Sequence, residues 1–193
     1  MPKLGMEPIR REALVQATIA EIGDAGSLDV TVSRIARRAG VSAALAHHYF
    51  GGKEQIFVAA MRHILAQYGA GVRLALAGAR TPRARLDAVI AAGFSPENFD
   101  EATIGAWLNF YVQARVVPEA ERLLRVYQRR LRSNLVHDLR PLVGDGAPDV
   151  AETLAALIDG IYIRAALGEG LPDGAAATAR VARVLDRLLE ERG

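Results

Sequence analysis

The sequence predicts an all-α protein of about nine helices. Glycine and proline recur at intervals of roughly one helix length, and apolar residues recur every three or four positions between them. Strand-like alternation of β-branched and polar residues is nearly absent. The chain has 193 residues, of which 51% are hydrophobic and 24% charged, so it can bury a sizeable core and has the composition of a globular protein.

Three helices are expected in the first fifty residues. The first, from about Ile9 to Ala25, carries apolar residues at helical spacing and ends where glycines follow. Thr31 is an N-cap residue for a short second helix through Arg38. Ser42 caps a third helix, about 43–50, which ends before a pair of glycines.

Three more helices are expected in the middle of the chain. Lys53 opens a long helix through about Ala79, which resembles a connector between two parts of the protein. Pro82 lies in the first turn of the next helix, where its missing N–H is tolerated. Residues 93–96, Gly-Phe-Ser-Pro, interrupt that helix, and another is expected over 100–116.

The last third of the chain is expected to hold three helices and one long loop. A helix from Pro118 to about Arg140 has leucine, valine and tyrosine residues on one face. Residues 141–148 contain two prolines and two glycines, which predicts a turn-rich loop. The final two helices are expected over 150–167 and 175–191.

The composition excludes several kinds of site. Without cysteine, the chain has no disulfide, cysteine-based zinc site, iron–sulfur ligation or cysteine nucleophile. Of the four histidines only His47 and His48 are close in sequence, and neighbours diverge by about 100° on a helix, so neither a metal nor a cofactor is expected. No apolar leader and no uncharged run of 18 residues is present, which predicts a cytoplasmic protein without a membrane span.

Positive charge is concentrated in one segment. The whole chain carries 24 Lys and Arg against 22 Asp and Glu, a net charge of only +2. Residues 31–53 nevertheless hold Arg34, Arg37, Arg38 and Lys53 and no acidic residue. This segment is therefore the first place to look for an anionic partner.

The same segment has the pattern of a helix-turn-helix unit. Ala36 is small enough to let two helices approach, Gly40 can adopt the left-handed conformation of the turn, and Val41 can fill the angle between the helices. The second helix of such a unit fits the major groove of DNA, and hydroxyls and N–H groups at helix N-termini meet phosphates. The alternative is a plain three-helix packing unit with solvated charges. The candidate DNA-binding residues are Thr31, Ser42, Ala43, Ala44, His47, His48, Tyr49 and Lys53.

The stretch from Thr31 to Lys53 resembles the N-terminal signature of the TetR family of transcriptional repressors. The resemblance implies a helix-turn-helix DNA-binding domain over 1–52, and a ligand-binding and dimerisation domain over 53–193. Family members usually have glycine at the position of Ala44, tyrosine at His47 and histidine at Tyr49, so this sequence departs from the family pattern at three positions in the reading helix.

The residues at His47, His48 and Tyr49 resemble those of one branch of the family, the choline-responsive repressors of glycine betaine synthesis. The branch resemblance implies a choline-like effector, a homodimer and a double-stranded DNA operator. Further matches to the branch lie in all three thirds of the chain, at residues 2–11, 106–110, 130–135, 157–160 and 164–167.

An aromatic cluster is the candidate effector site. A quaternary ammonium group has no N–H to donate, so ring faces and a carboxylate must hold it. The alternative is that the aromatic residues are ordinary core. Asp159 lies in an apolar stretch and needs a partner, either Arg164, a cationic ligand or another salt bridge. The candidate ligand-binding residues are Trp107, Phe110, Tyr111, Tyr127, Asp159 and Tyr162.

The last two helices carry apolar stripes wide enough for a four-helix bundle between two copies, which is how dimers of the family form.

Two other functions remain open: a repressor that responds to a lipophilic drug or acyl ligand, and an all-α enzyme acting on a small amphiphile. An arginine stripe on the helix from Pro118 is expected to be a solvated face rather than a second nucleic-acid surface, because acidic residues share that helix. The apolar stripes comprise Val150, Leu154, Leu157, Ile158, Ile161, Val181, Val184, Leu185, Leu188 and Leu189, and the arginine stripe comprises Arg122, Arg125, Arg129 and Arg132.

Overall fold

A computed structural model describes residues 5–168 and 170–191 of the chain. In these ranges it contains nine α-helices, one short 3-10 helix and no strand, which confirms the all-α prediction. Pro2 and Lys3, part of the expected N-terminal match, lie outside the described residues. The helices are α1 (Met6–Ala25), α2 (Val32–Arg38), α3 (Ala43–Phe50), α4 (Lys53–Gly78), α5 (Pro82–Gly93), α6 (Glu101–Gln113), α7 (Pro118–Val143), η1 (Gly144–Gly146), α8 (Ala147–Leu167) and α9 (Gly174–Glu190).

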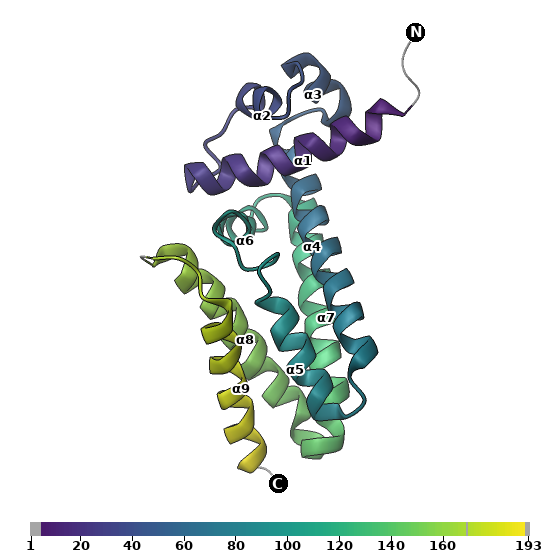
Figure 1. Ribbon diagram of the computed structural model, residues 1–193, viewed down its shortest axis with the longest axis vertical. Coiled ribbons are helices and arrows are strands. Elements are labelled where there is room, and N and C mark those ends of the chain that lie inside the picture. Colours follow the sequence, from purple (N-terminus) through teal and green to yellow (C-terminus); the bar gives the residue numbers. More distant parts are fainter. Residues whose placement is uncertain (1–4, 169, 192–193) are drawn as a thin grey trace.

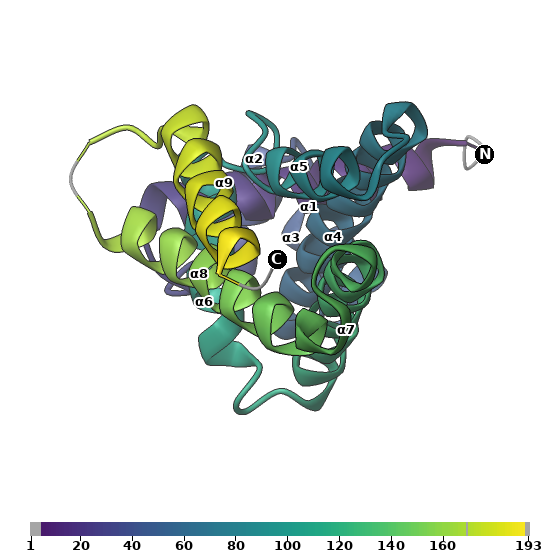
Figure 2. The same cartoon turned by 90° about the horizontal axis from the view of Figure 1, so that it is seen from below.

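The helices form a small head on an elongated body (Figure 1). The head consists of α1, α2 and α3, and α1 lies across the end of the body. Helix α4 starts next to the head and runs down the body beside α7. Seen along the long axis, α8 and α9 form one flank and α4 and α7 the other, with α5 next to α4 (Figure 2).

A close helix crossing joins the head to the body. Gly23 of α1 lies against Ala102 of α6, and a Cβ atom on Gly23 would come within 2.5 Å of the Ala102 Cα. Gly105, one turn further along α6, also faces Gly23. Glycine at position 23 therefore allows two helix backbones to touch, and the head is packed directly on α6.

The apolar stripes expected to join two copies are mostly buried inside one chain. Val150, Leu154 and Ile158 of α8 are at most 4% exposed, and Val181 and Leu185 of α9 are 0% exposed. They pack within the chain because α8 lies against α6 and α7 and α9 lies against α5 and α8. The prediction that these stripes form the contact between copies is therefore wrong for these side chains.

Three predicted boundaries also change. Helix α1 begins at Met6 rather than Ile9, and α6 ends at Gln113 rather than Val116. The loop expected over 141–148 is wrong, because α7 continues through Pro141 to Val143 and α8 begins at Ala147. Burial explains the change: Leu142 and Val143 pack against the core, which offsets the hydrogen bond that Pro141 cannot make.

The described helices include none that is long and apolar enough to cross a lipid bilayer. Within the same residues, no group of three or more histidine, aspartate or glutamate side chains is arranged to hold a metal ion.

Candidate nucleic-acid interface and effector cavity

Local hydrogen bonds build the helix-turn-helix as expected. Thr31 Oγ1 accepts from the N–H of Arg34 at 3.2 Å, and Ser42 Oγ accepts from the N–H of Leu45 at 3.2 Å. Gly40 has φ 68°, the left-handed conformation that the turn requires. The predicted caps and turn are therefore confirmed.

One face of α3 is open to solvent. Ala44, His47 and His48 are exposed, whereas Ala46 is fully buried beneath them. Ala43 and Tyr49 are half-buried at the edges of that face. The exposed face can therefore enter a groove without disturbing the packing of the head.

Arg11, a residue that the sequence analysis did not single out, holds α3 in place. Its guanidinium Nη1 donates to the carbonyl oxygen of Tyr49 at 2.8 Å, and its Cζ lies 4.5 Å from the centre of the Phe50 ring. The contact combines a charge-assisted hydrogen bond with a cation–π interaction. No local sequence signal connects residues 38 positions apart.

The positive charge of the head is smaller than the sequence suggests. Glu21, only 8% exposed, pairs with Arg34 at 2.9 Å and with Arg38 at 3.3 Å, and Arg38 also pairs with Asp24. The four positive charges of residues 31–53 are therefore partly neutralised, because α1 lies against α2 and supplies two carboxylates. In the described part of the chain, Arg37 and Lys53 have no carboxylate partner within 4 Å.

Lys53 lies at the N-terminus of α4 and reaches back to the head. Its Nζ donates to the carbonyl oxygen of Leu28 at 3.0 Å, which ties α4 to the segment between α1 and α2. His47 Nδ1 lies 3.0 Å from the carbonyl oxygen of Gly51, an arrangement in which that nitrogen carries the proton. The start of α4 is thus fixed next to the exposed face of α3.

We expect Glu21→Ala to lower the free energy of unfolding by roughly 1–3 kcal/mol, because it leaves two arginines without their shared, mostly buried partner. Urea denaturation followed by circular dichroism measures the change. Asp24→Ala is the control, since that carboxylate is 62% exposed and, among the residues that the structure describes, forms an ion pair only with Arg38. It should cost less than about 1 kcal/mol. Equal costs for the two variants would contradict this role of Glu21.

A small closed cavity lies in the body, between α4 and the helices that follow. Its volume is about 10 Å³, close to that of one water-sized sphere. Half of the lining residues are aromatic, and the walls come from α4, α5, α6, α7 and α8 and the α5–α6 loop. They consist of Tyr68, Val89, Gly93, Asn98, Trp107, Tyr127, Ile158 and Tyr162.

Trp107 is the centre of the ring cluster. Its ring centre lies 4.7 Å from that of Tyr127, 5.8 Å from that of Tyr111 and 6.0 Å from that of Tyr162. Tyr68 of α4 completes the cluster by packing edge-on against Tyr127 at 5.8 Å. Tyr68 was not predictable from the sequence, because its position on the connector helix gives no sign of the ring that it meets.

The remaining candidate ligand residues lie outside the cavity walls. Phe110 is fully buried and packs towards Phe57 of α4 and Trp107, which makes it part of the core. Tyr111 donates from its hydroxyl to Asp159 Oδ1 at 2.9 Å. Asp159 is therefore partnered by Tyr111, whereas the expected partner Arg164 is exposed on another face of α8.

The charge of Asp159 acts on the whole ring cluster. Burial raises the pKa of Asp159, although the Tyr111 hydrogen bond lowers it in part. Burial also raises the pKa of each of four tyrosines, and the negative charge of Asp159 raises each further. The same field that opposes tyrosinate formation favours a cation in this region. These four tyrosines are Tyr68, Tyr111, Tyr127 and Tyr162.

Helix α4 connects the two regions. It carries Lys53 next to α3 and Tyr68 in the cavity wall, about 22 Å apart at 1.5 Å per residue. Arg62 on α4 pairs with Glu119 of α7, and His63 Nδ1 lies 3.3 Å from Glu12 of α1. A displacement of α4 at the cavity would therefore reach the head through a continuous helix.

Comparison with protein families gives two matches. Residues 14–60 match the model described as "Bacterial regulatory proteins, tetR family". Residues 82–190 match the model described as "BetI-type transcriptional repressor, C-terminal". Together the matches cover most of the head and most of the body.

Similar proteins agree with these matches. The HTH-type transcriptional regulator BetI of Brucella suis is 53% identical over 182 residues, which cover 94% of this chain and 92% of that protein. The protein of the same name from Rhizobium meliloti is 52% identical over 168 residues, which cover 86% of this chain and 83% of that one.

Solved structures share the fold at lower identity. A TetR transcription regulator from Haloarcula marismortui has a TM-score of 0.79 at 20% identity, covering 96% of this chain and 98% of its own. A Saccharomonospora viridis protein, described as a transcriptional regulator and crystallised in complex with choline, also has a TM-score of 0.79 at 20% identity, covering 93% and 97%. The chain therefore belongs to the BetI-type transcriptional repressors of the TetR family, and it regulates transcription rather than catalysing a reaction.

Proposed function

We propose that the protein is a cytoplasmic homodimeric repressor that binds an operator through α3 and responds to choline or a closely related quaternary ammonium compound, so that it controls genes of glycine betaine synthesis. Residues 1–52 form the DNA-binding domain, and residues 53–193 bind the effector and the second copy. The observation that carries this proposal is the ring cluster around Trp107 with the Asp159 carboxylate beside it.

The DNA-binding half of the proposal rests on the exposed face of α3. His47 and His48 are its exposed polar residues, and the same segment, residues 31–53, holds two capped helix N-termini and the charges of Arg37 and Lys53. Helix N-termini and lysines are suited to phosphates, and side chains on the helix face are suited to base edges. The other candidate contacts are Thr31, Ser42, Ala43, Ala44 and Tyr49.

Titration of DNA from upstream of the coding sequence, followed by fluorescence anisotropy, tests this half. Affinity should fall steeply as salt rises, and His47→Ala and Lys53→Ala should each weaken binding. Binding that neither variant changes would contradict the role of this face.

The effector half rests on the chemistry of the ring cluster. Ring faces attract a quaternary ammonium group by about 0.5–2 kcal/mol each, and a nearby carboxylate adds to the attraction. A lipophilic acyl ligand would gain nothing from Asp159, and its own carboxylate would be repelled. The S. viridis protein, which has a similar fold, was crystallised in complex with choline, and this supports the effector half of the proposal.

A quaternary ammonium group enters this region only if the rings move apart. The cavity of about 10 Å³ is far smaller than such a group, and we propose that binding displaces Tyr68 from Tyr127. Displacing Tyr68 moves α4, whose first residue is fixed beside α3. Binding of the effector and the position of the reading helices are thereby coupled, and about 1–3 kcal/mol of coupling suffices for regulation.

The contact between copies is proposed on the outer face of α8. Ala156, Gly160, Ile163 and Leu167 recur at helical spacing, and Leu167 is 71% exposed. Small and apolar residues in one stripe let two helices pack closely. A two-fold dimer presents two copies of α3 to a pseudo-palindromic site.

We expect Asp159→Asn to weaken choline binding about tenfold, because it removes the negative charge closest to the rings. The pKa of Asp159 is raised in the folded protein, so its ionisation opposes folding. This penalty is absent below the pKa of an unfolded aspartate and grows as the pH rises through the raised pKa. The variant should therefore be more stable than the parent at neutral pH while binding choline less tightly.

Isothermal calorimetry from pH 4.5 to 8 and thermal denaturation measure the two effects. The choline affinity of the parent should fall as the pH is lowered. Because the pKa of Asp159 is raised, this fall should begin at a higher pH than it would for an ordinary aspartate. The choline affinity of the variant should not depend on pH in this range. Glu152→Gln is the control, because this α8 carboxylate is 75% exposed, and it should change affinity by less than about twofold. If Asp159→Asn bound choline as tightly as the parent, Asp159 would not be part of the effector site.

A further inference from the structure

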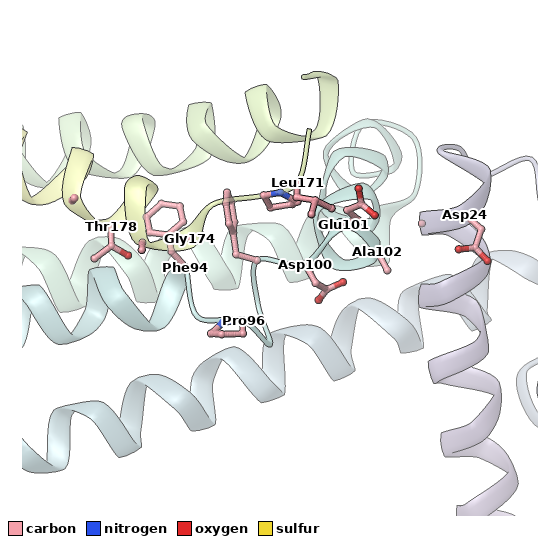
Figure 3. A pocket seen from close by; sticks show the side chains of 14 residues that line it. Asp24, Phe94, Pro96, Asp100, Glu101, Ala102, Leu171, Gly174 and Thr178 are labelled. Atoms are coloured by element: carbon pink, nitrogen blue, oxygen red, sulfur yellow. The ribbon is translucent and has the colours of Figure 1, made fainter. Parts of the chain in front are cut away.

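A large groove lies between the head and the body. It has a volume of about 1240 Å³ and is bounded by the end of α1, the α5–α6 loop, the start of α6 and the start of α9 (Figure 3). Most of its wall is apolar, including Phe94, Pro96 and Phe99. Three carboxylates, those of Asp24, Asp100 and Glu101, also line it, and no lysine or arginine does.

The three carboxylates differ in whether they already have an ion-pair or hydrogen-bond partner. Asp24 pairs with Arg38, and Asp100 caps α6 by accepting from the N–H of Thr103 at 3.0 Å and from its hydroxyl at 2.6 Å. Glu101 is exposed, and no ion pair of this side chain occurs within the described residues. Glu101 therefore contributes the most available negative charge at the groove.

A thin wall separates this groove from the closed cavity. Phe94 and Phe99 line the groove, while their neighbours Gly93 and Asn98 line the cavity. The ring of Tyr162, also in the cavity wall, lies 5.8 Å from that of Phe94 and 5.0 Å from that of Phe99.

The wall is held shut by hydrogen bonds. The Tyr162 hydroxyl donates to the carbonyl oxygens of Gly93 and Asn98, and the Asn98 side-chain amide donates to the carbonyl oxygen of Ala92 at 2.9 Å. The loop at 93–99 is thus a single layer of chain with a groove on one side and the ring cluster on the other.

Charge distinguishes this groove from a second one that also reaches the cavity wall. A groove of about 280 Å³ between α4 and α7 shares Tyr68 and Tyr127 with the cavity. Its lining includes Arg73 and Arg130 and no carboxylate. A cation is repelled there and attracted at the carboxylate-lined groove, since like charges repel and opposite charges attract at these distances.

We propose that the groove between α1, α6 and α9 is an outer binding site for organic cations, and that the loop at 93–99 is the gate through which the cation passes to the ring cluster. This inference rests on the proposed function, because it assumes that a cation reaches the cavity. The apolar walls hold the methyl groups of the ammonium, and Glu101 with Asp100 supplies the counter-charge. The passage requires the Tyr162 hydroxyl to release the loop.

Stopped-flow fluorescence of the full chain mixed with choline tests the proposal, with Trp107, the single tryptophan, as the probe. The observed rate should rise hyperbolically with choline concentration. The half-saturation concentration then reports the outer site, and the plateau reports passage through the gate. Glu101→Gln should raise the half-saturation concentration roughly two- to fivefold. Phe99→Leu should raise the plateau severalfold, because it loosens the ring contacts of the wall.

Arg130→Gln is the matched control and should leave both parameters unchanged, since it alters only the α4–α7 groove. An unchanged half-saturation concentration in Glu101→Gln, or a change in Arg130→Gln alone, would overturn the outer site, while equilibrium choline binding would still stand. Absence of equilibrium binding of choline in calorimetry would overturn the effector itself and the outer site with it.

Discussion

Ala44→Asp should abolish operator binding, with a loss of about 100-fold or more, while the protein stays folded. Ala44 is exposed in the first turn of α3, so the new carboxylate would face the DNA groove and its phosphates. A single unfavourable contact costs about 1–3 kcal/mol, and a dimer contains it twice. An acidic residue is tolerated in the first turn of a helix, so stability should change little.

Anisotropy titrations with labelled operator DNA measure this effect, and thermal denaturation verifies the fold. Ala70→Asp provides the control, because it places the same charge on an exposed position of α4 about 25 Å from its start. It should reduce affinity by less than about threefold. If the two variants behaved alike, α3 would not be the reading helix.

Arg85→Ala should destabilise the body by about 3 kcal/mol. Arg85 of α5 donates from Nε to Asp138 Oδ1 of α7 at 2.7 Å, and Asp138 is only 3% exposed. The second oxygen of Asp138 is buried without a hydrogen-bond partner. Loss of Arg85 would leave a buried carboxylate with no cation on the neighbouring helix, which is among the costliest single changes in a protein core.

Chemical denaturation gives the free energy of unfolding for this comparison. Arg132→Ala is the matched control, because its ion pair with Glu152 is long, 4.0 Å, and both side chains are more than half exposed. It should cost less than about 1 kcal/mol. The double variant Arg85→Leu with Asp138→Leu should regain most of the lost stability, since apolar groups then replace both charges. A small loss of stability in Arg85→Ala would show that water replaces Arg85 as the partner of Asp138, and it would contradict this prediction.

The helix-turn-helix was predictable because its determinants are local. Thr31 and Ser42 cap the helices that follow them directly, and Gly40 sits at the turn where its backbone conformation is needed. The family motif lies in the same short stretch. By contrast, the neutralisation of Arg34 and Arg38 by α1 depends on how two helices pack, which local sequence does not encode.

The effector region was predictable only in part, for the same reason. Trp107 and Tyr111 are four residues apart on one helix, so their proximity follows from helical periodicity. Tyr68 lies on α4, nearly forty residues before Trp107 in the sequence, so its contact with Tyr127 depends on how the helices pack. Asp138, an acidic residue on the arginine-rich helix α7, is buried because α5 packs against α7, which local sequence does not show.

The burial of the apolar stripes of α8 and α9 also depends on how the helices pack, which local sequence does not show. A stripe of apolar residues shows that a helix has a buried face, but it does not show whether the covering surface belongs to the same chain or to another copy. Val181 and Leu185 face α5 and α8 of their own chain, whereas Ile163 and Leu167 on the outer stripe of α8, the proposed contact between copies, are exposed.

Operator release by choline, compared with its uncharged isostere 3,3-dimethyl-1-butanol, tests the central claim most directly. The two molecules have nearly the same shape, and only choline carries the positive charge that the rings and Asp159 recognise. In anisotropy titrations with operator DNA, choline should weaken binding by about 5- to 150-fold and the isostere should leave it unchanged. An equal effect of the two compounds, or no effect of choline on a protein that binds the DNA, would contradict the account.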